Sequence, residues 1–342
     1  MTTPNREEIL LDVQGLQKYF PITKGIFRRT VGHVKAVENV SFQVHKGETL
    51  GVVGESGCGK TTMGLCIMHL IQPTQGTIRL NTDDGWVEVN ARSIRGLRDK
   101  MQIVFQDPFS SLNPRMRIRD IVAEPLQAHG MKSRRERYER VEALLQAVGL
   151  GSHHMNRFPH EFSGGQRQRI GIARALSLNP SLVVCDEPVS ALDVSVQAQV
   201  LNLLADLQEE FGLTYLFIAH DLSVVQHISD RVAVMYLGRI VEMGDVDSLF
   251  SRPKHPYTEA LLSAIPDPDP DVVGEQIILQ GDVPSPANPP AGCHFHPRCR
   301  YAQERCRREN PELVDVDGQG HLAACHYAQE LSLTGVYKGE TA

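Results

Sequence analysis

The stretch GESGCGKT at residues 54–61 constrains the fold of this chain more than any other feature of its sequence. It matches the pattern G-x-x-x-x-G-K-[ST], it follows the apolar run TLGVV at residues 49–53, and a helix-forming segment comes directly after it. In that context the glycines let backbone N–H groups curl around phosphates, and the positive end of the helix faces them. The sequence therefore predicts an α/β fold with a nucleotide-binding site on this loop.

The loop contains both polar side chains that a nucleoside triphosphate requires. Lys60 brings a positive charge to the β- and γ-phosphates, and the Thr61 hydroxyl is a ligand for Mg²⁺. The whole predicted nucleotide contact comprises Gly54, Glu55, Ser56, Gly57, Cys58, Gly59, Lys60, Thr61 and Thr62.

Two continuous apolar runs, at residues 181–185 and 214–219, are typical of strands that are buried on both faces of a parallel sheet. Asp186 and Glu187 follow the first run, and His220 follows the second. Since parallel strands end at the same edge of a sheet, all three side chains are expected beside the phosphate loop. We expect Asp186 to contact Mg²⁺, Glu187 to orient a water molecule against the γ-phosphate and His220 to reach that phosphate.

Gln106 lies where the predicted core passes into a mainly helical segment, residues 107–178, which includes a helix at residues 134–148. An amide on such a hinge can contact Mg²⁺ or water. The same segment contains a second glycine turn, FSGGQ at residues 162–166, which leads into a basic helix and is another candidate for phosphate binding. The chain thus has two phosphate-binding turns and the acidic residues for one hydrolytic site.

Charge and hydropathy exclude other classes of protein. The formal net charge is −6, whereas general nucleic-acid binders have a basic excess. The first residues lack the charged-then-apolar pattern of an export signal. The uncharged stretch at residues 61–78 contains proline, glutamine and glycine, so it fits a helix of about three turns better than a membrane span of roughly 20 apolar residues. The sequence therefore predicts a chain without a transmembrane segment.

Composition changes near residue 250. Ten of the 20 prolines fall between residues 251 and 300, including those of PDPDPD and PSPANPP. Proline at this density prevents long helices and central strands. We therefore predict one domain over residues 1–250, followed over residues 251–342 by a proline-rich connector and a small cysteine module.

Six motifs, GESGCGKT, VFQDP, FSGGQ, LVVCDEP, SALD and FIAHD, occur in the order and spacing of the ATP-binding-cassette (ABC) ATPases. The resemblance covers residues 9–250. It implies a P-loop NTPase core, an N-terminal antiparallel β subdomain and an α-helical subdomain. It also implies ATP hydrolysis with Mg²⁺, with Glu187 as the catalytic base, His220 as the switch histidine and Gln106 as the sensing glutamine. Phe162 departs from the family, which more often has leucine there.

The same resemblance implies that two cassettes stack head to tail, with each ATP bound between the phosphate loop of one and the signature turn of the other. The residues of this turn that would contact ATP on the partner are Ser163, Gly164, Gly165 and Gln166. Asp193 would lie across the seam between the cassettes. The partner is a second copy or a sister subunit. An aromatic ring should stack on adenine, and Phe20 aligns with that role, with Tyr19 as its rival.

The tail stretches RPKHPYTEALLSAIP and GDVPSPANPPAGCHFHPRC resemble the C-terminal extension of ATPases that drive dipeptide and oligopeptide importers. The resemblance implies peptide import. It places the chain at the cytoplasmic face of the membrane, beneath two transmembrane permease subunits that an extracellular peptide-binding protein supplies. Import of nickel or another small solute and a non-transport ABC ATPase acting on nucleic acid are the alternatives.

Four of the seven cysteines lie in the tail with the spacing C-x5-C-x6-C-x18-C, namely Cys293, Cys299, Cys306 and Cys325. This spacing matches neither the paired layout of zinc sites nor the ferredoxin runs, but four thiolates favour a soft metal. Resemblance to importer ATPases with similar tails implies a [4Fe–4S] cluster. We expect its role to be structural, because a small proline-rich module buries little apolar surface and metal bonds can replace a core. Zinc and free thiols remain alternatives. A mixed zinc site would draw on His294, His296, His321 and His326.

Overall fold

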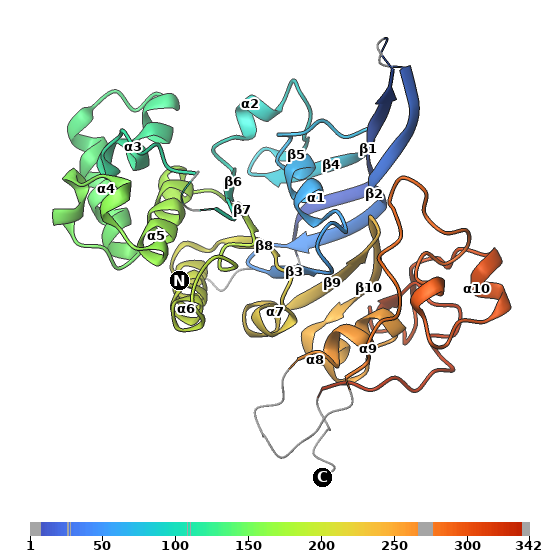
Figure 1. The fold of residues 1–342 in the computed structure, drawn as a ribbon. Coiled ribbons are helices and arrows are strands. Elements are labelled where there is room, and N and C mark those ends of the chain that lie inside the picture. Colours follow the sequence, from blue (N-terminus) through green and yellow to red (C-terminus); the bar gives the residue numbers. More distant parts are fainter. Residues whose placement is uncertain are drawn as a thin grey trace.

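The computed structural model describes residues 8–25, 27, 29–107, 109, 111–265 and 276–336. These residues form two sheets, a helical subdomain at one end and a C-terminal extension at the other (Figure 1). The predicted proline-rich stretch PDPDPD, at residues 266–271, lies outside the described residues.

The smaller sheet is antiparallel and comes from the first ninety residues. Its four strands lie in the order β2-β1-β4-β5. Their bounds are β1 Ile9–Lys24, β2 Arg29–His45, β4 Gln75–Thr82 and β5 Gly85–Glu88. All three pairings are antiparallel, from Ile9 opposite His45 to Lys24 opposite Arg29 in the longest. The N-terminal antiparallel β subdomain is thereby confirmed.

The larger sheet has eight strands in the order β11-β12-β10-β9-β3-β8-β7-β6. Its five parallel strands are β3 Thr49–Val53, β6 Met101–Val104, β7 Leu182–Asp186, β8 Thr214–Ile218 and β9 Arg231–Tyr236. Every residue of β3, β7 and β8 is buried. Since β-branched and aromatic residues fill these runs, they suit a strand that is covered on both faces.

The two faces of this sheet pack into different cores because alternate side chains of a strand point in opposite directions. Val52, Val184 and Leu216 join the core shared with the antiparallel sheet. Val53 and Phe217 join the other core, which continues into the helical subdomain. The central sheet is therefore the layer that connects the three subdomains.

Helices cover both faces of the larger sheet. Their bounds are α1 Lys60–Ile67, α2 Ile94–Leu97, α6 Val194–Phe211, α7 Leu222–Ile228 and α8 Val246–Ser251. Helix α1 lies between the two sheets (Figure 1). It is shorter than the predicted three turns, because His69 leaves the helical conformation with a φ of 49° and the chain then turns into β4.

The helical subdomain contains α3 Ile118–Ala128, α4 Arg134–Ala147 and α5 Gly164–Ala175. Leu126, Leu144 and Ile170 meet in its core. Helix α4 begins where the sequence predicts it, because Ser133 caps it and accepts a hydrogen bond from the N–H of Glu136. The helical subdomain is confirmed, and its limits at residues 107 and 178 stay a prediction.

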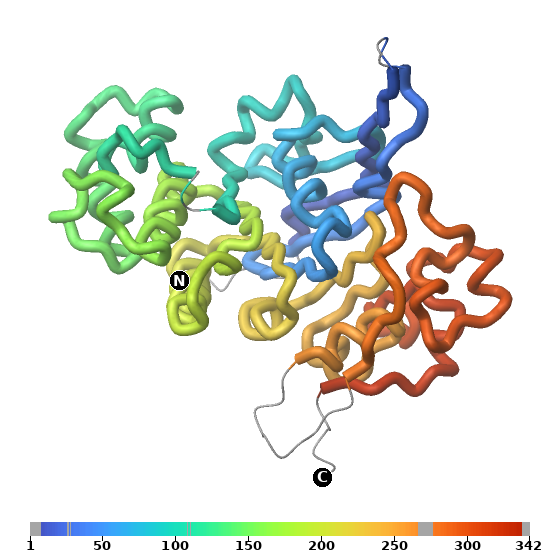
Figure 2. Tube along the Cα trace, viewed as in Figure 1, coloured from blue at the N-terminus to red at the C-terminus, as the bar shows by residue number. Residues whose placement is uncertain are grey.

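The C-terminal extension wraps against the edge of the larger sheet (Figure 2). Its regular elements are α9 Pro256–Leu262, α10 Glu304–Arg308, β11 Val314–Asp315 and β12 Leu322–Ala323. Strand β12 pairs antiparallel with β10, Arg239–Asp245, and so extends the core sheet. Among the described residues no helix is both long and apolar enough to cross a membrane.

Candidate active site

The phosphate loop joins β3 to α1, and its glycines allow it to pack closely on neighbouring strands. Gly54 and Gly59 have positive φ angles of 153° and 109°. A Cβ atom on Gly54 would lie 2.1 Å from the carbonyl oxygen of Met235, and one on Gly59 would lie 2.0 Å from that of Ala36. Only glycine allows this approach and these angles together.

The side chains of the loop divide by exposure. Lys60 is only 4% exposed, and its Nζ donates hydrogen bonds to the carbonyl oxygens of Gly54 (2.6 Å) and Glu55 (3.1 Å). The ammonium group therefore lies inside the curl of the loop. Of the other predicted contacts, the buried ones are Gly54 and Cys58, the half-buried ones Glu55, Gly59 and Thr62, and the exposed ones Ser56, Gly57 and Thr61.

Asp186 ends β7 beside the loop and is 5% exposed. Burial raises the pKa of its carboxyl group, and the hydrogen bond from the Thr61 hydroxyl, 2.9 Å from Oδ1, opposes that rise. Gln106 lines the same groove as Asp186. Carboxylate, hydroxyl and amide oxygens are the donors that Mg²⁺ prefers, and a cation would offset the cost of burying the charge. These residues therefore fit a magnesium ion.

The ends of three strands bring their side chains to one carboxylate oxygen. Oε2 of Glu187 accepts a hydrogen bond from Nε2 of Gln106 at 2.9 Å and lies 3.1 Å from Nδ1 of His220. Glu187 has a φ of 46°, and its N–H donates to the carbonyl oxygen of Ile218. A positive φ in a non-glycine residue is strained and is commonest at functional sites. The geometry thus brings His220 and Glu187, which the sequence placed at this edge, together with Gln106 from the hinge.

The second glycine turn forms the beginning of α5. Ser163 accepts a hydrogen bond from the N–H of Gln166, and the Gln166 side chain accepts one from the N–H of Ser163. This reciprocal cap fixes the turn. A Cβ atom on Gly165 would lie 2.4 Å from Val196, so α5 and α6 can pack this closely only with glycine there. Phe162 fills a core position and is 4% exposed.

The second turn does not complete the first loop within one chain. Helix α5 lies on one side of β6 and β7, and α1 lies on the other (Figure 1). Among the described residues, the hydrogen bonds and ion pairs of Ser163 and Gln166 do not reach the phosphate loop. Asp193, at the start of α6, is exposed.

The two aromatic candidates for adenine contact differ in their surroundings. Phe20 on β1 is 37% exposed, and the ammonium of Lys18 lies 4.9 Å from the centre of its ring. The hydroxyl group of Tyr19 donates a hydrogen bond to Oε1 of Glu38, at 3.3 Å between the two oxygens. Phe20 is thus the more exposed of the two rings, and its contact with adenine stays a prediction.

Two residues of the extension contact the phosphate loop, and sequence reasoning missed both. The hydroxyl oxygen of Tyr257 accepts a hydrogen bond from the N–H of Glu55 at 2.8 Å. Arg298 donates to both carboxylate oxygens of Glu55, at 2.7 and 3.0 Å. Arg298 lies in the stretch GDVPSPANPPAGCHFHPRC, which indicated the extension but no contact with the phosphate loop, and it is 243 residues from Glu55.

The four tail cysteines line one small apolar cavity of about 20 Å³. Burial raises the pKa of Cys299 to about 12 and that of Cys325 to about 11, so without a bound cation these thiols stay protonated at neutral pH. Within the described ranges, no three Cys, His, Asp or Glu side chains are arranged to hold a single metal ion.

The nearby histidines give little support to a mixed zinc site. Nδ1 of His296 lies 2.9 Å from the carbonyl oxygen of Cys293, and Nε2 of His326 lies 3.0 Å from that of Glu309. Nε2 of His321 lies 2.7 Å from the buried carboxylate of Glu242.

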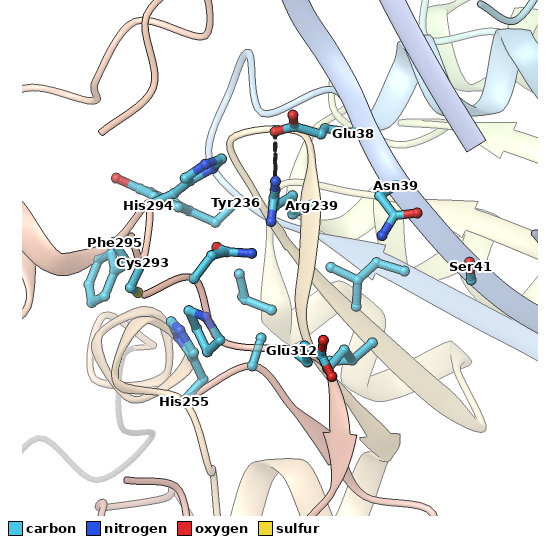
Figure 3. Close-up of a pocket in the computed structure, with 16 residues that line it drawn as sticks. Glu38, Asn39, Ser41, Tyr236, Arg239, His255, Cys293, His294, Phe295 and Glu312 are labelled. Carbon is cyan, nitrogen blue, oxygen red and sulfur yellow. Dashed lines mark hydrogen bonds and ion pairs between the residues drawn. The ribbon is translucent and has the colours of Figure 1, made fainter. Parts of the chain in front are cut away.

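A larger cavity of about 540 Å³ lies between the extension and the core. Figure 3 shows His294 and Cys293 reaching it from the extension, and Arg239 and Glu38 from the core. Arg239 donates to Glu38 at 3.1 Å. The residues predicted for the nucleotide do not line this cavity, so it is separate from the active site.

Comparison with known proteins defines the class of this chain. Residues 37–190 match the family described as "ABC transporter". The fold is similar to that of the ATP-binding cassette MJ0796, solved as a dimer bound to ADP and Pi, with 28% identity, a TM-score of 0.60 and coverage of 69% of this chain and 99% of that one. It is also similar to cbiO1 from Clostridium perfringens, part of the ABC transporter complex cbiONQ, with 28% identity, a TM-score of 0.59 and coverage of 71% and 91%. The chain is an ABC-type ATPase.

The C-terminal extension shows to which family of ABC ATPases the chain belongs. Residues 241–306 match the family described as "Oligopeptide/dipeptide transporter, C-terminal region". The chain is 55% identical over 328 residues to the oligopeptide transport ATP-binding protein AppF of Bacillus subtilis, covering 95% of this chain and 99% of that one. It is 52% identical over 318 residues to the dipeptide transport ATP-binding protein DppF of Haemophilus influenzae, covering 93% and 96%. The chain belongs to the family of ATP-binding subunits of oligopeptide and dipeptide ABC transporters.

Proposed function

We propose that this chain hydrolyses ATP to drive the import of dipeptides or oligopeptides. The observation that carries the proposal is the convergence of Gln106 and His220 on the carboxylate of Glu187, next to the pair of Thr61 and Asp186. Membership of the peptide-transporter family supports the choice of cargo.

The phosphate loop binds the triphosphate. Lys60 exchanges its contacts with the loop carbonyls for the β- and γ-phosphates. Thr61, Gln106 and Asp186 would hold Mg²⁺, which when bound would neutralise charge on these phosphates. Phe20 stacks on adenine. The exposure of the Phe20 ring supports its contact with adenine, and the common groove of Gln106 and Asp186 supports the magnesium site.

Glu187 is the catalytic base. Its carboxylate orients a water molecule for attack on the γ-phosphate and accepts a proton from it. His220 contacts the γ-phosphate through the imidazole ring that now lies 3.1 Å from Glu187. Gln106 reports the presence of the γ-phosphate to the helical subdomain, because it follows β6 at the point where the chain enters that subdomain.

Two cassettes close on ATP head to tail. The signature turn of one chain, with Ser163, Gly164, Gly165 and Gln166, contacts the γ-phosphate that the phosphate loop of the other binds. Asp193 lies at the seam. The capped N-terminus of α5 supports this role, because a helix start with a glycine turn binds anions. The partner is a second copy or a sister subunit.

The transporter that contains this pair has two transmembrane permease subunits and receives peptides from an extracellular binding protein. The chain then lies peripherally at the cytoplasmic face of the membrane. Phe105 and Phe109, which are 37% and 61% exposed next to Gln106 in the chain, support permease docking, since exposed apolar side chains mark interaction surfaces. Nucleic acid is not a partner in this scheme.

Residues 251–342 form a connector and a module that a [4Fe–4S] cluster stabilises, and residues 1–250 form the ATPase domain. The cluster would be held by Cys293, Cys299, Cys306 and Cys325. Their common cavity supports this assignment. The role is structural, because metal bonds replace the apolar burial that a proline-rich segment lacks.

Replacing Glu187 with Gln tests the proposed function. The variant should bind ATP with an affinity within a few fold of wild type, and its turnover should fall about a hundredfold or more because the base is lost. It should also accumulate as an ATP-bound dimer, which size-exclusion chromatography with ATP detects. Glu210→Gln, an exposed residue of α6, is the matched control. Unchanged turnover in Glu187→Gln would refute the assignment.

A further inference from the structure

Two residues of the extension bind Glu55, the acidic residue of the phosphate loop. Glu55 accepts two hydrogen bonds from Arg298 through its carboxylate, and its N–H donates to the hydroxyl oxygen of Tyr257. Its carbonyl oxygen accepts a hydrogen bond from Lys60. Glu55 is therefore fixed at all three of its polar groups, and two of these contacts come from outside the ATPase domain.

Arg298 is itself held rigidly. It ends the short 3-10 helix His296–Arg298, its N–H donates to the carbonyl oxygen of Phe295, and its side chain is only 7% exposed. The ring of Phe295 is buried against Tyr236 and Tyr257, at 5.2 and 5.3 Å between ring centres. Figure 3 shows Phe295 and Cys293 side by side on this segment. A bidentate pair on such a support has a fixed geometry.

Electrostatics explain why the pair matters for nucleotide binding. Glu55 lies between Gly54 and Ser56 in the loop that receives a triphosphate, so its unpaired carboxylate would repel the ligand. Arg298 cancels that charge, and its two bonds hold the first half of the loop in place. Because the pair is largely buried, solvent screens it weakly.

We propose that Arg298 is a positioning residue for ATP, which neutralises Glu55 and preorganises the phosphate loop without touching the nucleotide. The C-terminal extension then sets the ATP affinity of the cassette. This inference rests on the proposed function, since it assumes that ATP binds at this loop.

The test measures ATP affinity and turnover in the same full-length variants. Arg298→Gln should raise the Kd for ATP, measured by equilibrium binding on the Glu187→Gln background, about tenfold. In the otherwise wild-type chain within the assembled transporter, it should raise the KM for ATP similarly and leave kcat within about twofold. The defect should shrink at high salt, because salt screens the repulsion between Glu55 and the phosphates.

A double variant separates this role from a loss of structure. Glu55→Gln combined with Arg298→Gln removes both charges and should restore the Kd to within about threefold of wild type. Arg300→Gln is the matched control, since Arg300 lies in the same segment but pairs with Glu259 and not with the loop. It should change neither Kd nor kcat. Arg298→Lys, which keeps the charge with one donor group, should show a defect of about threefold.

Several outcomes overturn the inference. An unchanged Kd in Arg298→Gln does so, as does a fall in kcat with unchanged KM, or a double variant as weak as the single one. If Arg298→Gln melts below the assay temperature, Arg298→Lys decides the question in the same way. A wild-type chain that binds no ATP would refute the proposed function as well as the inference. If the wild type binds ATP and Arg298→Gln has the same Kd, only the inference is refuted.

Discussion

Asp186 and Glu187 are neighbours in the chain, yet the backbone gives them different tasks. Asp186 is the last residue of β7 and keeps the strand direction, so its carboxylate is buried beside Thr61. Glu187 takes a φ of 46°, which turns the next carboxylate toward Gln106 and His220. One unusual backbone conformation thus separates the proposed cation ligand from the proposed base.

The buried charge of Asp186 leads to a prediction at pH 7. Burial raises its pKa in the folded chain above 3.8, so the folded state binds the proton more tightly than the unfolded state. Stability from this group is therefore present below pH 3.8 and is lost as pH rises through the raised pKa. Asp186→Asn avoids this loss and should raise the Tm of the nucleotide-free chain at pH 7 by roughly 1–3 °C.

The gain in stability should accompany a loss of function. Turnover of Asp186→Asn should fall about a hundredfold or more, because a magnesium ligand is removed. The Tm difference from wild type should disappear as the pH approaches 4. Asp206→Asn, an exposed position on α6, is the control and should leave Tm and turnover unchanged. A lower Tm for Asp186→Asn at pH 7 would contradict the argument.

At the scale of residues, sequence reasoning found the groups that follow strands and loops of recognisable pattern. Asp186, Glu187 and His220 were placed together because strand ends of a parallel sheet share an edge, and Gln106 was placed on the hinge to the helical segment. The hydrogen bonds show that Gln106 and His220 meet at Glu187. Arg298 and Tyr257 could not be found in this way. Their contact with Glu55 depends on how a proline-rich segment folds back, which no periodicity encodes.

Among the elements, the buried strands were the easiest to predict and the short ones were the hardest. β7 and β8 are continuous apolar runs, and α4 starts at a capping serine, so local chemistry defines them. β11 and β12 have two residues each and exist because they pair with each other and with β10. Such strands depend on tertiary contact and leave no local signal.

The four-cysteine module leads to a prediction about the iron content of the protein. Full-length protein purified without oxygen should contain about four irons per chain, with charge-transfer absorption in the visible range. Cys299→Ser should lose most of the iron and lower the Tm, because a ligand to the stabilising cluster is removed. Metal analysis and a spectrum check both results.

The same measurements distinguish the alternatives for the module. His326→Asn is the matched control and should keep its iron, because Nε2 of His326, which also lines the cysteine cavity, lies 3.0 Å from the carbonyl oxygen of Glu309. One zinc per chain with no iron would favour a zinc site. Protein free of both metals, with an unchanged Tm in Cys299→Ser, would leave the four cysteines as ordinary thiols.

In the whole molecule, the central sheet connects the parts that we propose to act on the same nucleotide. The antiparallel sheet carries Phe20, the central sheet carries the acidic edge, and the extension holds Glu55 through Arg298. The signature turn is the exception, because α5 and the phosphate loop lie on different sides of β6 and β7 (Figure 1). In the proposed head-to-tail arrangement, a single chain therefore has two half-sites and completes neither.

Mixing two inactive variants tests whether these half-sites belong to different chains. Lys60→Ala disables the phosphate loop, and Gly164→Asp adds a negative charge to the signature turn, where a Cβ meets only Leu192, at 3.4 Å. In a head-to-tail pair, a mixed dimer contains one site in which both halves are intact. If the chain pairs with itself, a 1:1 mixture with random pairing should therefore recover about a quarter of the wild-type rate, while each variant alone stays inactive.

The control for this experiment is a mixture of wild-type chain with the double variant Lys60→Ala and Gly164→Asp. In a dimer of one wild-type chain and one double variant, each of the two sites combines a defective half with an intact half. Such mixed dimers should be inactive, so the measured rate should come from wild-type pairs alone. The ATPase rate is measured over a range of protein concentrations. Because each site needs a second chain, the specific activity of the wild type should fall on dilution below the dissociation constant of the pair. Full activity at concentrations where the chain is monomeric by light scattering would show that one chain completes its own site.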